Sequence, residues 1–278
     1  MGKHRIVVSA ENNPYMAWQC KLFHYSCVSR VGLTPTFVVH DYGETWQPGF
    51  REIVAAGGVV RGAPSYALTA RGRDYAPRNT PGTLLHAAEM FEGADEFIVL
   101  CDPDMIFIEK PGFARTLSGE FYNYMCYEQE VVQEAARRFG VSPAEVAGRE
   151  ELCCGVPYVI PVAVARPLAE AWLEAVDVFP RPIWESVMYA LGFAVARLKM
   201  SLKLTHLVGE RCRMGSRPEG DMIHYCYSGD TWDKRRFFTE EEAGGVWEAR
   251  GRARRGTILA EILTQIREAR KFYARFAL

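Results

Sequence analysis

The first hundred residues alternate between short apolar runs and longer stretches that carry apolar residues at helical spacing. Tyr15, Trp18, Leu22, Tyr25 and Val28 recur every three or four positions, which predicts a helix over residues 15–31. The same pattern predicts strands at residues 5–10, 34–41, 59–64 and 97–100, and further helices at residues 50–58 and 82–93. Strands that alternate with helices form α/β folds, so we expect a mainly parallel central sheet flanked by helices.

The second half of the chain has a less regular pattern. Apolar runs predict a strand at 119–128, a strand pair within 153–165 and a last strand at 221–230. Helical spacing predicts two short helices within 129–151 and longer ones at 166–179, 182–200 and 257–276. Trp172 and Trp184 lie among apolar helical positions, so both are expected in the core. No repeat or low-complexity linker interrupts the pattern, which favours one compact domain over residues 1–278.

Composition narrows the class of protein. A chain of 278 residues with 49% hydrophobic residues is long enough for a sizeable core, and a net charge of -1 gives no general attraction to nucleic acid. No apolar run reaches the roughly 18 residues of a membrane helix, so no transmembrane segment is expected. The eight cysteines lack the spacing of a disulfide framework or a zinc site, which is typical of a reduced, cytoplasmic protein. Most of them, including Cys226, lie in apolar or helical patterns, where a small buried thiol is the ordinary interpretation.

Two carboxylates follow directly after a predicted buried strand. Residues 97–100 are continuously apolar, and Asp102 and Asp104 come next with Pro103 between them. Burying two like charges beside a core is costly unless something pairs with them. Two carboxylates in an extended segment can converge on one hard cation, Mn²⁺ or Mg²⁺, which can also bridge the phosphates of a nucleotide. The alternative is a solvated turn between two strands.

Candidate partners for these carboxylates stand near the other end of the chain. His224 lies between apolar residues on a predicted strand, where a core histidine is the ordinary interpretation and a third cation ligand is the functional one. Lys234 and Arg235 follow shortly after it and are suited to neutralising a diphosphate. A solvated basic turn is the alternative for both.

Several segments together resemble a known family. Residues 15–20 have the pattern Tyr-x-x-Trp-Gln-Cys, and the other matching segments follow in order as RNTPGTLLHAAEM, EFIVLCDPDMIF, WESVMYALGFAVA and HYCYSGDTWDKRRF. From Val7 to about Phe237 the chain resembles the peptidyl hydroxyproline O-arabinosyltransferases of plants and, more distantly, the peptidyl serine O-galactosyltransferases. The resemblance implies a GT-A fold, a UDP-sugar donor, a divalent cation, and transfer to a hydroxyl group with retention of the anomeric configuration.

The resemblance also implies roles for individual residues. Asp102, Asp104 and His224 fall on the metal-binding positions, and Arg78 and Asn79 fall on the loop that faces the donor. The remaining expected donor-site residues are Ser9, Ala10 and Asn12 near the nucleoside, Tyr15 or Tyr75 stacked on the uracil, Gly155 in the sugar pocket, and Lys234 and Arg235 at the diphosphate. Glu185 is the candidate catalytic carboxylate on the sugar side, with helix capping as the alternative.

This architecture predicts a nucleotide-binding half at about residues 1–110, a sugar and acceptor half at about 111–240, and a C-terminal helix at about 256–276. UDP-arabinofuranose and UDP-galactose are the first donors to consider, and the acceptor hydroxyl belongs to a protein, a glycan or a lipid-linked molecule. The plant enzymes are Golgi membrane proteins, so the lack of an anchor here indicates a soluble, bacterial-type homologue in the cytoplasm.

Two other functions fit parts of the pattern. A nucleotidyltransferase also has paired carboxylates after a strand, but it needs a glycine-rich, lysine-bearing loop after its first strand, where this chain has SAENNPY. A catalytically silent UDP-sugar-binding or scaffold protein would keep the fold while losing its metal ligands. The presence of all three expected ligands disfavours that alternative.

Overall fold

The computed structural model describes residues 3–41, 43, 45–208, 214–226 and 232–276. Its contacts divide the chain into two compact units, each assembled from separate stretches of sequence. The first unit contains Met1–Val7, Ala63–Leu100 and Phe113–Thr205, and the second contains Val8–Gly62, Cys101–Gly112 and His206–Leu278. That the whole chain forms a single domain stays a prediction.

Seven strands are hydrogen-bonded in the order β3-β2-β1-β4-β7-β6-β8. They are β1 His4–Glu11, β2 Thr36–His40, β3 Val59–Ala63, β4 Phe97–Cys101, β6 Ser118–Phe121, β7 Cys154–Pro161 and β8 Lys203–Thr205. Strand β7 runs antiparallel to both β4 and β6, whereas β6 and β8 are parallel. The expected α/β fold with a mainly parallel sheet and flanking helices is confirmed, and β7 is its reversed strand.

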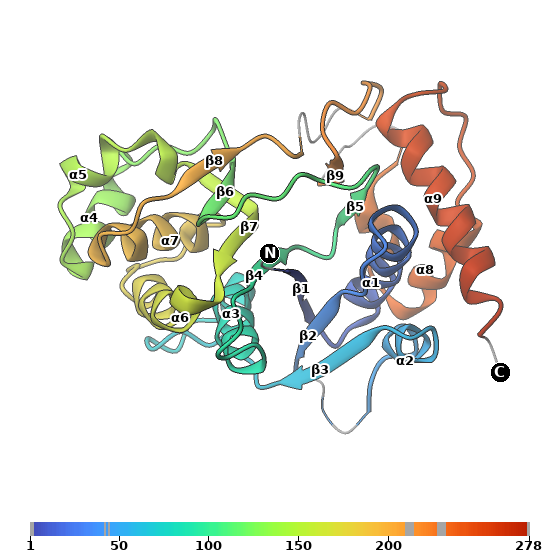
Figure 1. Cartoon of the computed structure of the whole chain (residues 1–278), viewed down its shortest axis with the longest axis horizontal. Helices are drawn as coiled ribbons and strands as arrows, with labels where there is room; N and C mark the ends of the chain where they lie inside the picture. Colours follow the sequence, from blue (N-terminus) through green and yellow to red (C-terminus); the bar gives the residue numbers. More distant parts are fainter. Residues whose placement is uncertain (1–2, 42, 44, 209–213, 227–231, 277–278) are drawn as a thin grey trace. The chain divides into compact units, whose positions relative to one another are not determined.

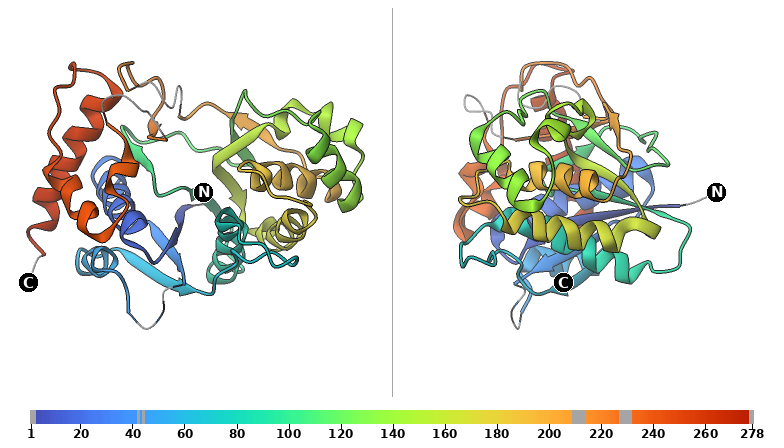
Figure 2. Two further views of the ribbon diagram at one scale, coloured as in Figure 1. Left: turned by 180° about the vertical axis from the view of Figure 1, so that it is seen from behind. Right: turned by 90° about the vertical axis from the view of Figure 1, so that its left-hand side faces the viewer.

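The second unit is built around one apolar cluster. Its helices are α1 Pro14–Ser26, α2 Pro48–Ala55, α8 Glu240–Gly245 and α9 Ile258–Tyr273, and its small sheet pairs β5 Met105–Phe107 with β9 Met222–His224. Helices α8 and α9 lie beside α1 (Figures 1 and 2). Trp18, Ile223, Tyr225 and Ile262 are buried in the cluster between these elements. The predicted C-terminal helix is confirmed, because its apolar face is buried in this cluster.

Helix packing defines the first unit. Its helices are α3 Asn79–Met90, α4 Glu130–Phe139, α5 Pro143–Ala147, α6 Val162–Asp177 and α7 Ser186–Arg197, and α6 packs against both α3 and α7 (Figure 1). Trp172 on α6 is fully buried and donates its indole N–H to the carbonyl of Val187 at 2.6 Å, as expected for a core tryptophan. The core prediction for Trp184 is wrong, since this side chain is 65% exposed. Helix α7 begins only at Ser186, so Trp184 precedes the helix.

Other differences from the predicted elements are local. The strand pair expected within 153–165 is the single strand β7, after which α6 begins at Val162. The expected last strand at 221–230 is the short β9, and its residues 227–230 lie outside the described part of the chain. Within the described residues, no helix is both long enough and apolar enough to span a membrane.

Candidate functional site

Two carboxylates and an imidazole meet where β4 ends and β5 begins. Strand β5 pairs with β9 so that Met105 lies opposite His224, and the backbone N–H of Tyr225 donates to the carbonyl of Asp104 at 3.0 Å. This pairing brings the Nε2 atom of His224 to 3.1 Å from Oδ1 of Asp104 and to 4.0 Å from Oδ2 of Asp102. The three side chains expected to bind a metal are therefore close together, all within the second unit.

Lys234 adds a positive charge to this cluster. Its ammonium group forms an ion pair with Oδ2 of Asp104, and each of the two side chains is only 9% exposed. The carboxylate of Asp233 accepts from the backbone N–H of Arg235 at 2.8 Å and so caps the short 3₁₀ turn Lys234–Phe237. At the end of this turn, the carbonyl of Phe237 accepts from the indole of Trp18 at 3.0 Å. These bonds fix the position from which Lys234 reaches Asp104.

Arg235 has a different environment from Lys234. Its guanidinium pairs with the carboxylate of Asp233, with Nε at 3.0 Å from both oxygens, and its side chain is 58% exposed. Of the two basic residues assigned to a diphosphate, Lys234 pairs with a carboxylate of the cluster, whereas Arg235 pairs with its neighbour Asp233. The role of Arg235 stays a prediction.

The pKa values of the cluster show how its charges compete. Burial by itself raises the pKa of Asp104, but the charges of Lys234 and His224 and their hydrogen bonds hold it well below its usual range. Burial and the neighbouring charge of Asp104 raise the pKa of Asp102 to about 6, against the smaller opposing effects of His224 and Lys234. Burial is the largest single effect on Lys234 and lowers its pKa, but the charge and hydrogen bond of Asp104 together with smaller contributions from its other neighbours outweigh burial and raise it overall. An added positive charge would therefore stabilise the ionised form of Asp102 more than that of Asp104.

A cysteine that sequence reasoning assigned to the core joins the cluster. One potential ligand atom from each of Asp104, His224 and Cys226 lies within 4.8 Å of the other two. A carboxylate oxygen, an imidazole nitrogen and a thiol sulfur form a donor set that fits a divalent cation. The sequence signal that could have pointed to Cys226 is its spacing: His224 and Cys226 are two residues apart, as are Asp102 and Asp104.

The residues expected near the nucleoside lie in the same unit. Ser9 and Ala10 are buried in β1, and the side chain of Asn12 holds the loop after β2. Its amide donates to the carbonyl of Thr45 at 2.9 Å and its oxygen accepts from the backbone of Gln47 at 2.9 Å. The nucleoside roles of these three residues stay predictions.

Tyr15 is half-buried at the start of α1. Its ring centroid lies 4.9 Å from that of Phe238, and its hydroxyl contributes to raising the pKa of Lys234. The structure therefore brings Tyr15 into electrostatic range of Lys234, and its stacking on the uracil stays a prediction.

Arg78 and Asn79 belong to the first unit, where their side chains form hydrogen bonds with one long loop. The guanidinium of Arg78 donates to Asp177 at 2.7 Å and to the carbonyl of Tyr66 at 2.9 Å. The side-chain oxygen of Asn79 accepts from the backbone N–H of Tyr66 at 2.8 Å. Both side chains thereby order the segment before α3, and their role toward a donor stays a prediction.

Gly155 and Glu185 also lie in the first unit. Gly155 is buried in β7, where an added Cβ would meet the ring of Tyr122 at 2.6 Å and the methyl of Met188 at 2.9 Å. Glu185 is the half-buried residue before α7 and makes no capping hydrogen bond with its side chain. The capping alternative is therefore not seen, and the catalytic role of Glu185 stays a prediction.

The start of α7 is instead fixed by a tyrosine. The hydroxyl of Tyr75 accepts from the backbone N–H of Val187 at 2.9 Å and donates to the carbonyl of Trp184 at 2.8 Å. Because these bonds lie on either side of Glu185 in the chain, Tyr75 fixes the backbone at that residue. Tyr75 is buried, and its stacking on uracil, the alternative to Tyr15, stays a prediction.

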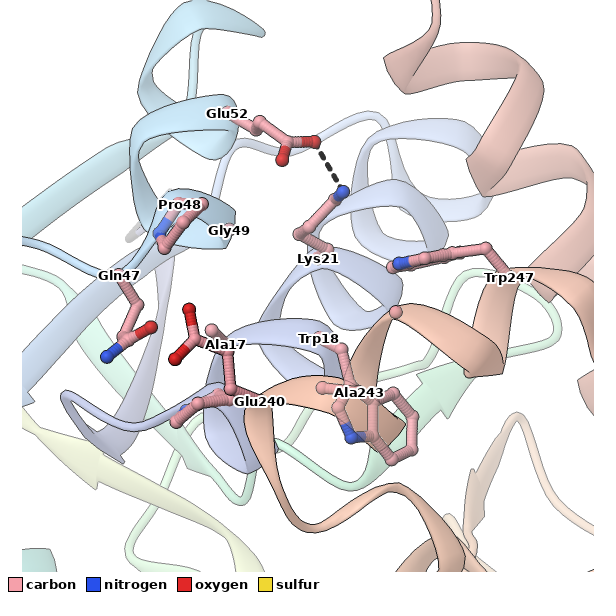
Figure 3. Close-up of a pocket in the computed structure, with 12 residues that line it drawn as sticks. Ala17, Trp18, Lys21, Gln47, Pro48, Gly49, Glu52, Glu240, Ala243 and Trp247 are labelled. Carbon is pink, nitrogen blue, oxygen red and sulfur yellow. Dashed lines mark hydrogen bonds and ion pairs between the residues drawn. The ribbon is translucent and has the colours of Figure 1, made fainter.

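A separate cavity of about 150 Å³ lies between α1, α2 and α8 (Figure 3). Within it the ammonium of Lys21 forms an ion pair with Glu52 and lies 4.5 Å from the ring centroid of Trp247. The charge of Lys21 is thus already balanced inside the fold. None of the residues that line this cavity belongs to the predicted donor site.

Comparisons with known proteins show which structures share this fold. No family model and no curated protein matches the chain. The apo structure of the bifunctional glycosyltransferase WbbM is similar with a TM-score of 0.52 and 12% sequence identity, over 99% of this chain and 52% of that one. This chain therefore spans about half the length of WbbM. The likeness shows the fold, which is a glycosyltransferase fold of the GT-A type, as expected from the sequence.

Two structures of the galactosyltransferase LgtC are also similar. One is a complex with donor and acceptor sugar analogues, with a TM-score of 0.46 and 16% identity, and it covers 87% of this chain and 95% of LgtC. The other is an active-site mutant of LgtC, with a TM-score of 0.47, 14% identity and the same coverage.

Proposed function

We propose that this protein is a metal-dependent, retaining glycosyltransferase that moves a sugar from a UDP-sugar to a hydroxyl group of an acceptor. The observation that carries the proposal is the meeting of Asp102, Asp104 and His224 with Lys234, in a chain that shares its fold with WbbM. Carboxylates gathered at the carboxyl end of a sheet strand suit a cation that binds a diphosphate.

Each charged residue of the cluster has a part in this function. Asp102, Asp104 and His224 hold the cation, Mn²⁺ or Mg²⁺, which when bound offsets the negative charge that develops on the departing diphosphate. Lys234, already placed on Asp104, supplies a further positive charge toward the phosphates, and Arg235 adds a second one at the surface.

On the sugar side we assign Glu185. The residue directly precedes α7, where the helix N-terminus stabilises a negative charge. Retention requires either a carboxylate nucleophile or a path in which the leaving phosphate takes the proton of the acceptor hydroxyl. Glu185 serves as the nucleophile in the first case and as an electrostatic support in the second.

The resemblance to the plant arabinosyltransferases sets the order in which substrates are tried. UDP-arabinofuranose and UDP-galactose come first as donors, and hydroxyl groups of proteins, glycans and lipid-linked molecules are the acceptor classes. Cytoplasmic location is part of the same proposal. A pocket distinguishes two sugars that differ by one hydroxyl through a few polar contacts, so a donor screen is needed to choose between them.

Calorimetry of UDP binding tests the proposal. We expect the native chain to bind UDP with Mn²⁺ present and to lose this binding with a chelator. Asp104→Asn should lose it under both conditions, whereas the exposed Asp74→Asn should bind like the native chain. Hydrolysis of a UDP-sugar is then measured with the native chain. Metal-dependent binding without hydrolysis of any donor would indicate the silent sugar-nucleotide-binding protein, and no binding under either condition would rule out the proposal.

A further inference from the structure

Two pairs of residues face each other across the β5–β9 pairing. Asp102 and Asp104 precede β5, and His224 and Cys226 end the partner segment. Tyr225, between His224 and Cys226, is completely buried in the apolar cluster of the second unit, with its ring 6.2 Å from that of Trp18. The N–H of Cys226 donates to the carbonyl of His224, which makes Tyr225 the centre of a tight turn with His224 and Cys226 on either side of it.

The backbone fixes Cys226 in this place. Its N–H donates to the carbonyl of His224 at 2.9 Å, and the N–H of Tyr225 donates to the carbonyl of Asp104 at 3.0 Å. Both bonds lie on the N-terminal side of the Cys226 side chain and fix the backbone that leads into it. The result is the close approach already described, with one donor atom each from Asp104, His224 and Cys226 within 4.8 Å of one another.

The thiol changes which cation the site prefers. Mg²⁺ binds oxygen ligands and disfavours sulfur, whereas Co²⁺, Zn²⁺ and related transition metals accept thiolate together with imidazole. Cys226 is half-buried, so a metal that reaches Asp104 and His224 also reaches its sulfur.

We propose that Cys226 supplies a thiolate ligand to the cation bound by Asp104 and His224, and that this ligand selects a transition-metal ion over Mg²⁺. The inference rests on the cation site of the proposed function and adds to it the fourth ligand and the metal class. On binding, the thiol releases its proton to solvent, a sulfur lone pair forms the bond to the metal, and no oxidation takes place.

Cobalt spectroscopy tests the thiolate directly. The full chain, kept reduced with a phosphine, is titrated with Co²⁺ while the near-ultraviolet and visible spectra are recorded. We expect a sulfur-to-cobalt charge-transfer band that saturates at one metal per chain. Cys226→Ser should lose the band but keep the visible bands of bound Co²⁺. Cys126→Ser and Cys153→Ser, at an exposed and a half-buried cysteine, should keep both, as should Cys212→Ser, at a position outside the described residues.

Metal affinities give a second measurement. Loss of a direct ligand should cost at least as much as loss of an outer-shell partner, so Cys226→Ser should weaken Co²⁺ and Zn²⁺ binding about tenfold or more. Binding of Mg²⁺ should change about twofold at most, because oxygen replaces a donor that Mg²⁺ does not use.

The outcomes separate this inference from the proposed function. Visible Co²⁺ bands in the native chain without a charge-transfer band would overturn the Cys226 ligand and leave the cation site in place. A charge-transfer band that survives in Cys226→Ser would overturn it as well. If the band is present and depends on Cys226 but UDP fails to bind, the ligand assignment stands and the glycosyltransferase proposal fails.

Discussion

Lys234 forms a buried ion pair with Asp104, a residue 130 positions earlier in the chain, and the same carboxylate lies 3.1 Å from the imidazole of His224. The ammonium group therefore supplies, in this structure, positive charge at the point where a divalent cation is expected. Lys234 both stabilises the folded chain and competes with that cation for one oxygen of Asp104. The two effects lead to separate predictions.

The first prediction concerns stability. Asp104→Asn should lower the free energy of unfolding by about 3 kcal/mol, because it leaves the ammonium of Lys234 buried without its counter-charge. The double variant Asp104→Asn with Lys234→Met should recover most of this loss, since it also removes the unpaired charge. Urea unfolding without added metal measures both. Glu248→Gln is the matched control, because its ion pair with Arg270 is exposed and should contribute less than about 1 kcal/mol. An Asp104→Asn variant as stable as the native chain would contradict the buried pair.

The second prediction concerns binding. Lys234→Gln should bind Mn²⁺ alone about tenfold more tightly, because the competing ammonium is gone, a change of about 1.4 kcal/mol. The same variant should bind UDP in saturating Mn²⁺ about tenfold more weakly, because one charge toward the diphosphate is lost. Calorimetry with metal alone and then with UDP separates the effect on metal binding from the effect on UDP binding. Lys110→Gln, at an exposed lysine, serves as control. Weaker binding of both ligands would show that Lys234 only maintains the structure of the site.

The chemistry of this cluster could be predicted from the sequence, but its assembly could not. Asp102 and Asp104 follow a continuous apolar run, and this local signal identifies the end of β4. Their contact with His224 depends on β5 and β9, two strands of three residues each that lie far apart in the chain. Strands this short have no reliable periodicity, so the sequence pointed to the residues without showing how they meet.

The wrong predictions for Trp184 and Cys226 have the same physical origin. Helical spacing of apolar residues continues back through residues 182–185, which suggested a helix from Pro182 and a buried Trp184. The helix starts at Ser186 because the hydroxyl of Tyr75, more than a hundred residues away, holds the N–H of Val187. Cys226 was assigned to the core because a thiol in an apolar segment usually is buried. Its place beside Asp104 follows from the same long-range strand pairing.

A third prediction tests the packing around Gly155. Gly155→Ala should lower the free energy of unfolding by about 2 kcal/mol, because the new methyl group would lie 2.6 Å from the ring of Tyr122 in a well-packed strand. Gly112→Ala is the control: it has an ordinary backbone conformation and open space around its Cα, so it should be neutral or slightly stabilising. Denaturant unfolding of both variants provides the comparison. Equal stability of the two variants would show that β7 can shift to accept a side chain.

The last prediction is a loss of stability in acid that depends on His24. This side chain is completely buried between α1 and α9, with Nδ1 at 2.7 Å from the hydroxyl of Tyr273, and its Nε2 has no hydrogen-bond partner in the described part of the chain. Burial lowers its pKa from the ordinary 6.5 to about 4. Between these two values the unfolded chain binds a proton that the folded chain does not bind, so the folded state loses stability as the pH falls.

The stability that the neutral His24 side chain provides is fully present above pH 6.5. It is lost as the pH falls to about 4, where the folded state also becomes protonated. A depression of this size corresponds to about 3 kcal/mol. Urea unfolding at pH 7.5 and at pH 4.5 measures how far the free energy of unfolding falls between the two pH values. This fall should be smaller by about 2 to 3 kcal/mol in His24→Gln than in the native chain. The comparison uses the difference between the two pH values, because the substitution also changes packing at both. His206→Gln, at an exposed histidine, should keep the full native dependence, and the same dependence in His24→Gln would show that other groups cause the acid sensitivity.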